Sequence, residues 1–431
     1  MSRSTCCLIA GLLAAWALVL SAMTSVPSED GVSYLWMAQQ FAAGEFRAAL
    51  SSVFPPGYPL LLAPGMALGA DPERLAQALG ALALAATVWP LARLGAAFAP
   101  GAAWPTVVLF AASPLLPRLA AEAYSEPAFV LVMAWGAWWG TQQRWWSVGT
   151  AAAVAFAIRP EGSLLAASFV CLQPWRAWRA LLPLGGSVLL LACARAAAGH
   201  GFDVLPLLAF HEQRDDLPDR GMVLVHLLRT PGLLLEAYAL AALLLVRAAT
   251  RRLPAVQRPA MWQVLLQIAV VATFVARRRF FVSCANAVYP LAGAVLAGWS
   301  PRWRHVALGG SVLLGVLLCL TGGVGADRAA EAAVGRWLAP QLQGQELVTD
   351  LPRIAWFAGH RPPAPRHFTA VQLLAQANAP DVRHVVLSIG SKRGQFDELQ
   401  QGLTEAFVRV ELPASLRELA ERRGIAVFAR R

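Results

Sequence analysis

Charged residues are scarce in this sequence. Only 14% of its 431 residues are Asp, Glu, Lys or Arg, whereas 57% are hydrophobic. A soluble protein of this length ordinarily carries about 25% charged residues. The deficit, together with repeated apolar runs of roughly 20 residues, excludes an ordinary soluble protein and predicts a polytopic membrane protein.

Lysine and cysteine are also rare. Lys392 is the only lysine, so nearly all of the positive charge behind the formal net charge of +11 is arginine. The arginines lie mostly in short loops between apolar runs, which indicates membrane topology and no nucleic-acid partner. The six cysteines lie in or beside apolar segments without metal-ligand spacing. This pattern argues against a disulfide framework, and we expect small buried hydrophobic residues instead.

Eleven apolar segments are predicted to be membrane helices. They cover residues 6–24, 75–97, 102–121, 126–142, 147–158, 163–174, 180–198, 233–249, 260–276, 281–299 and 305–325. If the N-terminus lies inside, arginine and tryptophan gather at the inside ends, as the positive-inside rule and an aromatic belt require. We therefore expect a multi-pass protein of the bacterial inner membrane with a cytoplasmic N-terminus, an uncleaved first helix and an extracytoplasmic C-terminal domain.

The expected fold class is mainly α: a polytopic membrane helix bundle, residues 1–326, followed by a small C-terminal α/β domain, residues 327–431. Two large outside loops cover residues 26–74 and 200–232. In the C-terminal region "GQELVTD", "VRHVVLSIG" and "GIAVFARR" read as strands. The stretches "QFDELQQGLTEAF" and "SLRELAERR" read as helices between them, which is typical of an α/β domain.

Segments 147–158 and 163–174 are too short to span a membrane separately, at about 1.5 Å of rise per residue. Between them lies "RPEG", Arg159 to Gly162. We expect a short helix, a break and a second short helix, with "RPEG" at the apex. Irregular backbone at that depth is tolerated only beside protein or a wet cavity.

Two adjacent carboxylates, Glu29 and Asp30, follow the first apolar segment in "VPSEDGVSYLWMAQQFAAGEF". One interpretation is structural: Asp30 is the N-cap of a helix that lies along the membrane interface. The other is chemical, because a positioned carboxylate can act as a general base. The two interpretations are compatible, and the acidic pair alone does not choose between them.

The order of several elements is more specific. The acidic pair is followed by "FPPGYPLLLAP", by "AYSEPAF" at the start of the fourth helix, by "RPEG" and by "RRRFFVSCANAVYPLAGAVLAG". Over residues 8–325 this order resembles the GT-C class of integral-membrane glycosyltransferases, in particular the bacterial branch related to protein O-mannosyltransferases and to the aminoarabinose transferases that modify lipid A.

The resemblance implies a specific activity. Such enzymes move a sugar from a polyprenyl-phosphate carrier within the lipid bilayer to a glycan, lipid or protein acceptor on the outer side. The acidic residue of their first outside loop acts as general base or helps to hold a divalent metal. Carried over, that residue is Asp30, with Glu29 as its neighbour; whether a metal takes part is unknown. A carboxylate in this role contributes a rate factor of about 10²–10⁴.

Arginine suits the leaving phosphate because its planar fork binds phosphate bidentately. Two places offer it on the outer side: Arg159, and the run Arg277, Arg278 and Arg279. Each has a structural alternative. The run also fits an anchor that snorkels to lipid headgroups, and Arg159 also fits an ion pair with Glu161 that pins the two short helices.

Other ionisable groups are further candidates, with Glu126 the third possible catalytic carboxylate after Asp30 and Glu29. Glu126 is either a neighbour of an N-cap at Ser125 or a second carboxylate of the site, and Glu122 is of the same kind. The loop that holds His200, His211, Glu212, Asp215, Asp216 and Asp219 reads as a solvated acidic loop more than as a metal site. In "WFAGHRPP", His360 and Arg361 are possible acceptor contacts.

The competing class is a lipid or polymer transporter, or a GT-C-like scaffold without catalysis. Transporters more often show repeat-related halves with interrupted helices at matching positions. Here the only interruption that the sequence predicts is the one around "RPEG", without a counterpart in the second half. This favours the enzyme.

Overall fold

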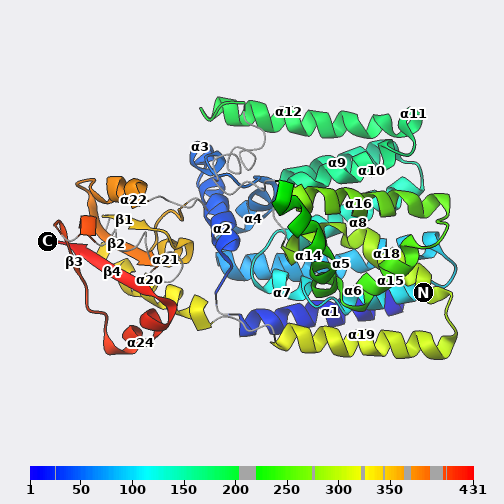
Figure 1. The fold of residues 1–431 in the computed structure, drawn as a ribbon. Coiled ribbons are helices and arrows are strands. Elements are labelled where there is room, and N and C mark those ends of the chain that lie inside the picture. Colours follow the sequence, from blue (N-terminus) through cyan, green and yellow to red (C-terminus); the bar gives the residue numbers. More distant parts are fainter. Residues whose placement is uncertain are drawn as a thin grey trace. The chain divides into compact units, whose positions relative to one another are not determined.

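The structure is a computed structural model. It describes residues 1–24, 26–202, 220–273, 277–321, 326–342, 345–363, 370–388, 401–403 and 405–431. The chain divides into two compact units (Figure 1). The helical unit consists of Met1–Met23 and Ala38–Gly322, and the sheet unit consists of Thr24–Met37 and Gly323–Arg431. The predicted boundary, 1–326 and 327–431, differs from this division in one important respect. The segment Thr24–Met37, which carries the acidic pair, groups with the C-terminal residues.

The helical unit is built of α-helices with a few short 3-10 turns. These are α1 (Arg3–Met23), α3 (Phe46–Leu50), α4 (Gly57–Ala67), α5 (Pro72–Phe98), α6 (Ala103–Ala111), α7 (Leu116–Ala121), α8 (Glu126–Thr141), α9 (Trp145–Ile158), η1 (Pro160–Gly162), α10 (Ser163–Val170), α11 (Pro174–Ala177), η2 (Trp178–Ala180), α12 (Leu181–Ala197), α14 (Arg220–Tyr238), α15 (Leu240–Ala249), η3 (Ala255–Gln257), α16 (Arg258–Thr273), α17 (Arg278–Phe281), η4 (Val282–Cys284), α18 (Ala285–Ala297) and α19 (Pro301–Thr321). Helix α2 (Glu29–Ala42) begins in the sheet unit and ends in the helical unit.

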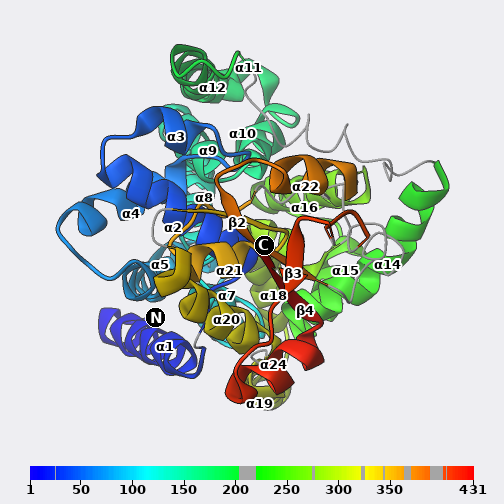
Figure 2. The same cartoon turned by 90° about the vertical axis from the view of Figure 1, so that its left-hand side faces the viewer.

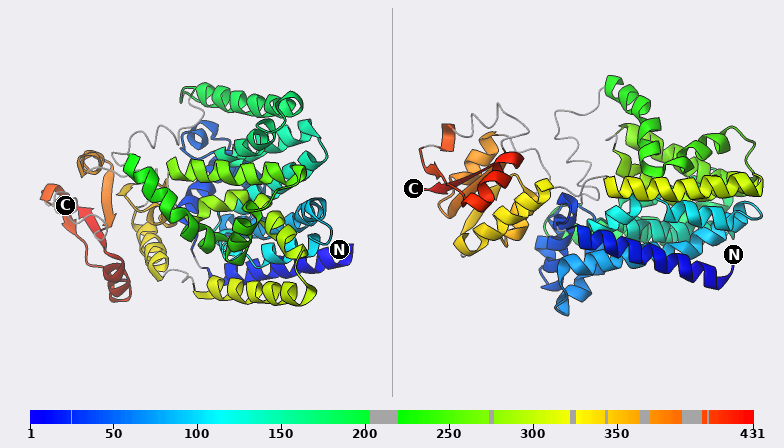
Figure 3. Two further views of the ribbon diagram at one scale, coloured as in Figure 1. Left: turned by 45° about the vertical axis from the view of Figure 1, so that its right-hand side comes forward. Right: turned by 90° about the horizontal axis from the view of Figure 1, so that it is seen from below.

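The burial of these helices follows from their place in the bundle. Helices α12 and α19 lie at opposite edges of the helical unit in Figure 1 and in the left view of Figure 3. Their leucines stay open: Leu190 of α12 is 70% exposed and Leu313 of α19 is 63% exposed. Helix α18 is central, with Tyr289 and Leu296 fully buried. Apolar side chains on outer helices are costly in water and suit lipid contact.

Within the described residues, five helices are long and apolar enough to cross a membrane: Arg3–Met23, Pro72–Phe98, Pro174–Ala197, Arg278–Ala297 and Pro301–Thr321. They support a multi-pass membrane location, and the count of eleven segments stays a prediction. The break around "RPEG" is confirmed, because α9 ends at Ile158, η1 follows and α10 begins at Ser163.

That break is not the only interruption, contrary to the prediction. The segment 102–121 divides into α6 and α7. Pro114 lies in the gap, where it cannot donate a backbone hydrogen bond and disfavours helix at the residue before it. The Ser113 hydroxyl oxygen accepts the Leu116 N–H (3.2 Å) and starts the new turn.

The segment 233–249 is interrupted as well. Helix α14 ends at Tyr238 and α15 begins at Leu240, with Ala239 between them at φ 49°. The Tyr238 hydroxyl donates to the Phe281 carbonyl, which ties this break to η4 and α17. Since other breaks exist, the number of interrupted helices does not separate an enzyme from a transporter.

The expectation of buried cysteines holds for half of them. Cys6, Cys284 and Cys319 are buried, whereas Cys7, Cys171 and Cys193 are exposed; all six are free thiols. A small, weakly polar side chain is tolerated on either face of an apolar helix, and apolar neighbours along the sequence do not show which face a residue takes.

The sheet unit is an α/β structure. Its elements, besides the start of α2, are α20 (Ala326–Leu342), β1 (Glu346–Thr349), α21 (Pro352–Phe357), α22 (Ala370–Ala377), β2 (Val382–Ser388), β3 (Phe407–Arg409), α24 (Ala414–Arg423) and β4 (Ile425–Arg430). The strand order is β1-β2-β4-β3. Strands β1 and β2 are parallel, and β4 runs antiparallel to both β2 and β3.

Both faces of this sheet are covered. Val385, Leu387 and Phe428 pack with α22 on one face, and Val386 and Val427 pack with α20, α21 and α24 on the other (Figure 2). The central strands β2 and β4 are buried on both sides and contain apolar runs, and the edge strand β1 carries the β-prone pair Leu347 and Val348, so all three are predicted correctly. Strand β3 is not: its first residue, Phe407, ends the stretch predicted as helix, and pairing with β4 overrides that local preference.

Candidate active site

Helix α2 begins with the acidic pair. The Ser28 side-chain oxygen accepts the Gly31 N–H (2.9 Å) and the Ser28 carbonyl accepts the Val32 N–H (3.0 Å), so Ser28 is the N-cap. The interpretation of Asp30 as the N-cap is therefore wrong. Glu29 and Asp30 instead occupy the first turn, where the helix dipole favours negative charge.

The two carboxylates have different surroundings. Glu29 is half-exposed and its Oε1 lies 3.5 Å from Nη1 of Arg353, on α21. Asp30 is partly buried. A second interaction holds the same helix, because the Arg361 guanidinium lies 4.8 Å from the centre of the Trp36 ring.

Among the described residues, the surroundings of Asp30 do not form a metal site. Across the described ranges, no three His, Cys, Asp or Glu side chains gather closely enough to hold one. Glu29, the nearest second oxygen donor along the chain, faces an arginine. We therefore derive the role of Asp30 without a metal.

Arg353 is part of a buried charge network that the sequence analysis missed. Its Nη1 donates to Oε2 of the fully buried Glu331 (2.6 Å), and Nε of Arg423 donates to Oε1 of the same carboxylate (2.9 Å). The available signal was weak: a single arginine within the otherwise apolar helix "PRIAWF". No local spacing links it to partners elsewhere in the chain.

Asp350 lies beside this network, directly after β1. Its Oδ1 accepts the Ser388 N–H (3.0 Å). Burial raises the pKa of the Asp350 carboxyl from 3.8 to about 6; Glu331 adds to the rise, whereas the hydrogen bond and Arg423 oppose it. The group therefore titrates close to physiological pH.

This shift predicts a pH effect on the sheet unit. The folded chain keeps the proton between about pH 4 and pH 6, where the unfolded chain has already released it, so stability falls as pH rises through that window. Two pKa units correspond to about 3 kcal/mol. Asp350→Asn keeps the oxygen that accepts from Ser388, and we expect its stability relative to wild type to rise by about 2–3 kcal/mol between pH 4 and pH 7. Hydrogen exchange of the β2 and β4 amides in the full chain, corrected for intrinsic rates, measures this difference in stability. The same pH dependence of stability in wild type and Asp350→Asn would contradict the prediction.

The helical unit brings together three ionisable residues of the predicted motifs "AYSEPAF" and "RPEG". Arg159, at the end of α9, lies with its Nη1 2.9 Å from Oε1 of Glu126, at the start of α8, and with its Nη2 2.9 Å from Oε1 of Glu161, in η1. The side chains of Arg159 and Glu126 are buried, that of Glu126 without any exposure, and that of Glu161 is 11% exposed. One guanidinium thus serves two carboxylates, and the alternative of an ion pair between Arg159 and Glu161 is confirmed with Glu126 added.

The arginine run meets this cluster through an aromatic ring. The guanidinium carbons of Arg159 and Arg279 lie 5.6 and 5.3 Å from the centre of the Phe280 ring, and that of Arg279 also lies 5.1 Å from the Tyr124 ring. These distances are within the range of cation–π attraction. Arg277 and Arg278 are exposed, and Arg278 makes a long pair with Glu236 (3.7 Å, both half-exposed).

The element "FPPGYP" packs directly on the chain before Arg159. A Cβ atom on Gly57 would lie 2.5 Å from the Ala157 carbonyl oxygen and 2.8 Å from the Ile158 nitrogen. Gly162 approaches α9 equally closely, since its Cβ would lie 2.3 Å from the Phe156 nitrogen. Two glycines of the predicted motifs therefore allow the backbone contacts that fix the "RPEG" turn.

We expect Gly57→Ala to destabilise the protein by about 1–3 kcal/mol, because the clash is with backbone that cannot rotate away. The measurement is the midpoint of thermal unfolding in detergent. Gly186→Ala on α12 is the matched control: its Cβ would meet nothing within 4 Å, and alanine is the better helix former. A Gly57→Ala midpoint equal to that of Gly186→Ala would contradict the expectation.

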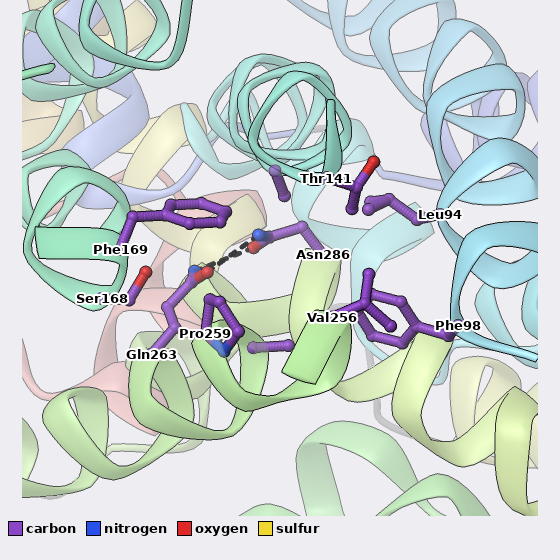
Figure 4. A pocket seen from close by; sticks show the side chains of 11 residues that line it. Leu94, Phe98, Thr141, Ser168, Phe169, Val256, Pro259, Gln263 and Asn286 are labelled. Atoms are coloured by element: carbon purple, nitrogen blue, oxygen red, sulfur yellow. Dashed lines mark hydrogen bonds between the residues drawn. The ribbon is translucent and has the colours of Figure 1, made fainter. Parts of the chain in front are cut away.

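A separate pocket lies between α5, α8, α10, α16 and α18 (Figure 4). It is lined by apolar residues together with Thr141, Ser168, Gln263 and Asn286. The amides of Gln263 and Asn286 exchange two hydrogen bonds of 3.0 Å. The lining carries no ionisable side chain, so the pocket offers neither a base nor a cation for phosphate.

The remaining candidates have simpler roles or stay untested. Glu122 pairs with Arg118 one turn earlier (3.8 Å). The His200 Nε2 lies 2.9 Å from the Arg47 carbonyl oxygen. His211, Glu212, Asp215, Asp216 and Asp219 lie outside the described residues, so the choice between a solvated loop and a metal site is open there.

This chain is similar to known proteins in its fold. No protein-family model matches the chain, and no curated protein matches it by sequence. Among solved structures, ArnT from Cupriavidus metallidurans bound to undecaprenyl phosphate superposes with a TM-score of 0.66 at 16% identity, over 100% of this chain and 98% of ArnT. The arabinofuranosyltransferase AftD from Mycobacteria gives 0.57 at 14% identity, over 100% of this chain and 42% of AftD. The Archaeoglobus fulgidus oligosaccharyltransferase gives 0.56 at 10% identity, over 92% and 71%.

All three are GT-C glycosyltransferases. The resemblance inferred from the order of motifs is thus confirmed as a resemblance of fold, and it extends beyond residues 8–325 to the C-terminal residues. At these identities the similarity is one of architecture, and the chemistry has to be argued from the residues of this chain.

Proposed function

We propose that this chain is a GT-C-like membrane glycosyltransferase that moves a sugar from a polyprenyl-phosphate donor to an extracytoplasmic acceptor. The observation that carries the proposal is the match over the full chain to an enzyme structure that holds undecaprenyl phosphate. The acidic pair at the start of a capped helix and the arginine run support it. The N-terminus is proposed to be cytoplasmic and the C-terminal residues extracytoplasmic.

The reaction is a substitution at the anomeric carbon. The Asp30 carboxylate takes the proton of an acceptor hydroxyl as its oxygen forms the new glycosidic bond. The bond between the anomeric carbon and the phosphate oxygen breaks, and its electron pair leaves with the polyprenyl phosphate. General-base help of this kind contributes a factor of about 10²–10⁴.

The leaving phosphate needs positive charge, and the two predicted arginine sites differ in what they offer. Arg159 already faces two carboxylates, which repel an anion, so it suits the role of organising α8, α9 and η1. Arg277 and Arg278 are exposed and Arg279 lies on aromatic rings. We therefore assign donor-phosphate binding to the run, and Glu126 to the ion pair more than to catalysis.

The test is sugar transfer by the purified full chain in proteoliposomes. A pool of polyprenyl-phosphate sugars is supplied in the bilayer, and in parallel the same sugars as nucleotide conjugates. We expect transfer from the lipid-linked donors only, since they reach a site beside the bilayer by lateral diffusion. Absence of transfer from a broad pool, with movement of the lipid between leaflets, would favour a transporter instead.

A further inference from the structure

We infer that Arg353 is a positioning residue for Asp30, and that the C-terminal part of the chain thereby belongs to the catalytic apparatus. The inference rests on the proposed role of Asp30 as the base. All the residues that carry it lie within the sheet unit.

Arg353 holds the beginning of α2 at two points. Its Nε donates to the Pro27 carbonyl (2.9 Å), immediately before the cap residue Ser28, and its Nη1 faces the Glu29 carboxylate (3.5 Å). One planar guanidinium therefore contacts both the backbone before the first turn and a side chain within it. Because a guanidinium presents its donors in a rigid fork, these two contacts fix a direction as well as a distance.

These contacts have a fixed origin, because Arg353 is itself buried and paired with a buried carboxylate. Its side chain is 7% exposed, and its partner Glu331, 2.6 Å away, is fully buried. The pair with the half-exposed Glu29 contributes little to stability. Its effect is to orient the helix, since the arginine end of the pair does not move freely.

A second contact lies two turns further along α2, where Arg361 lies on the Trp36 ring. The first half of the helix is thus attached to the C-terminal residues at both of its ends. Asp30 follows Glu29 in the first turn, so the orientation of this half-helix sets the direction of the Asp30 side chain. A general base must come within hydrogen-bonding reach of the proton it removes, and a displacement of about 1 Å can cost about 10²-fold in rate.

The two acids then have different roles: Glu29 anchors the turn and Asp30 removes the proton. Glu29→Gln keeps the shape of the anchor and a carbonyl oxygen for Arg353. We expect it to retain transfer within about tenfold of wild type, whereas Asp30→Asn does not.

The decisive comparison is Arg353→Met against Arg423→Met. Both remove one arginine from Glu331, but only Arg353 contacts α2. For Arg353→Met in the full chain we expect kcat to fall by about 10–100-fold with the donor KM nearly unchanged. The amides of Gly31 and Val32 should exchange at least about ten times faster, with β2 and β4 as protected as before. For Arg423→Met we expect wild-type kcat and wild-type exchange at Gly31 and Val32.

The outcomes separate this inference from the proposed function. Equal effects of the two variants, unchanged exchange at Gly31 and Val32 in Arg353→Met, or a loss in Glu29→Gln as large as in Asp30→Asn would each overturn it. The exchange measurement needs no sugar donor. If wild type transfers no sugar, the proposed function fails, and the assignment of Arg353 as the anchor of α2 is still decided by exchange.

Discussion

Asp30→Asn should lower the rate of sugar transfer by about 10²–10⁴-fold, because the amide keeps the size and polarity of the side chain but cannot accept the acceptor's proton. The donor KM should change little, since a base acts in the transition state and not in donor binding. Folding should be preserved, because Ser28 and not Asp30 caps α2. The measurement is the initial rate with labelled polyprenyl-phosphate sugar in proteoliposomes.

Asp71→Asn provides the matched control for this experiment. Asp71 also lies at a helix N-terminus, where its Oδ1 accepts the Arg74 N–H (2.8 Å), and asparagine is an equally good cap. We expect its transfer rate to stay within about twofold of wild type. If Asp30→Asn retains half of the wild-type rate, the base is another residue.

Arg159→Met should destabilise the protein strongly, and more than Gly57→Ala does. It leaves the fully buried carboxylate of Glu126 and the partly buried carboxylate of Glu161 without the cation that both face. Removing one partner of a buried ion pair costs about 3–5 kcal/mol. Unfolding of the purified protein by titration with sodium dodecyl sulfate in mixed micelles measures the loss.

A second substitution shows whether the loss arises from uncompensated charge. In the Arg159→Met background, Glu126→Gln removes one buried charge and should recover a large part of the stability. Arg278→Met, which breaks the half-exposed pair with Glu236, should cost less than about 1 kcal/mol. A loss of similar size for Arg278→Met and Arg159→Met would contradict the assignment of the loss to buried charge.

The sequence predicts those features that depend on neighbours along the chain. Pro160 and Gly162 mark the break between α9 and α10, and short β-prone runs mark β1, β2 and β4. The acidic pair is found from its position after the first apolar segment. Each of these signals lies within a few residues, so a single sequence contains it.

Features that depend on distant partners are not predicted. Arg353 donates to the carbonyl of Pro27, 326 residues earlier, and Glu331 collects two arginines from different helices. Nothing in the spacing of these residues distinguishes them from surface charges. For the same reason Ala239, which interrupts a segment that reads as one helix, has no local signal.

Helix α2 continues without a break from Glu29 to Ala42, while its residues up to Met37 belong to the same unit as Gly323–Arg431. The C-terminal region is therefore not an independent genetic module. A chimaera that exchanges only the residues after Gly323 would separate Arg353 and Arg361 from the partners they contact in residues 27–36. Exchange between related chains should preserve function only when both stretches are inherited together, as a discontinuous cassette.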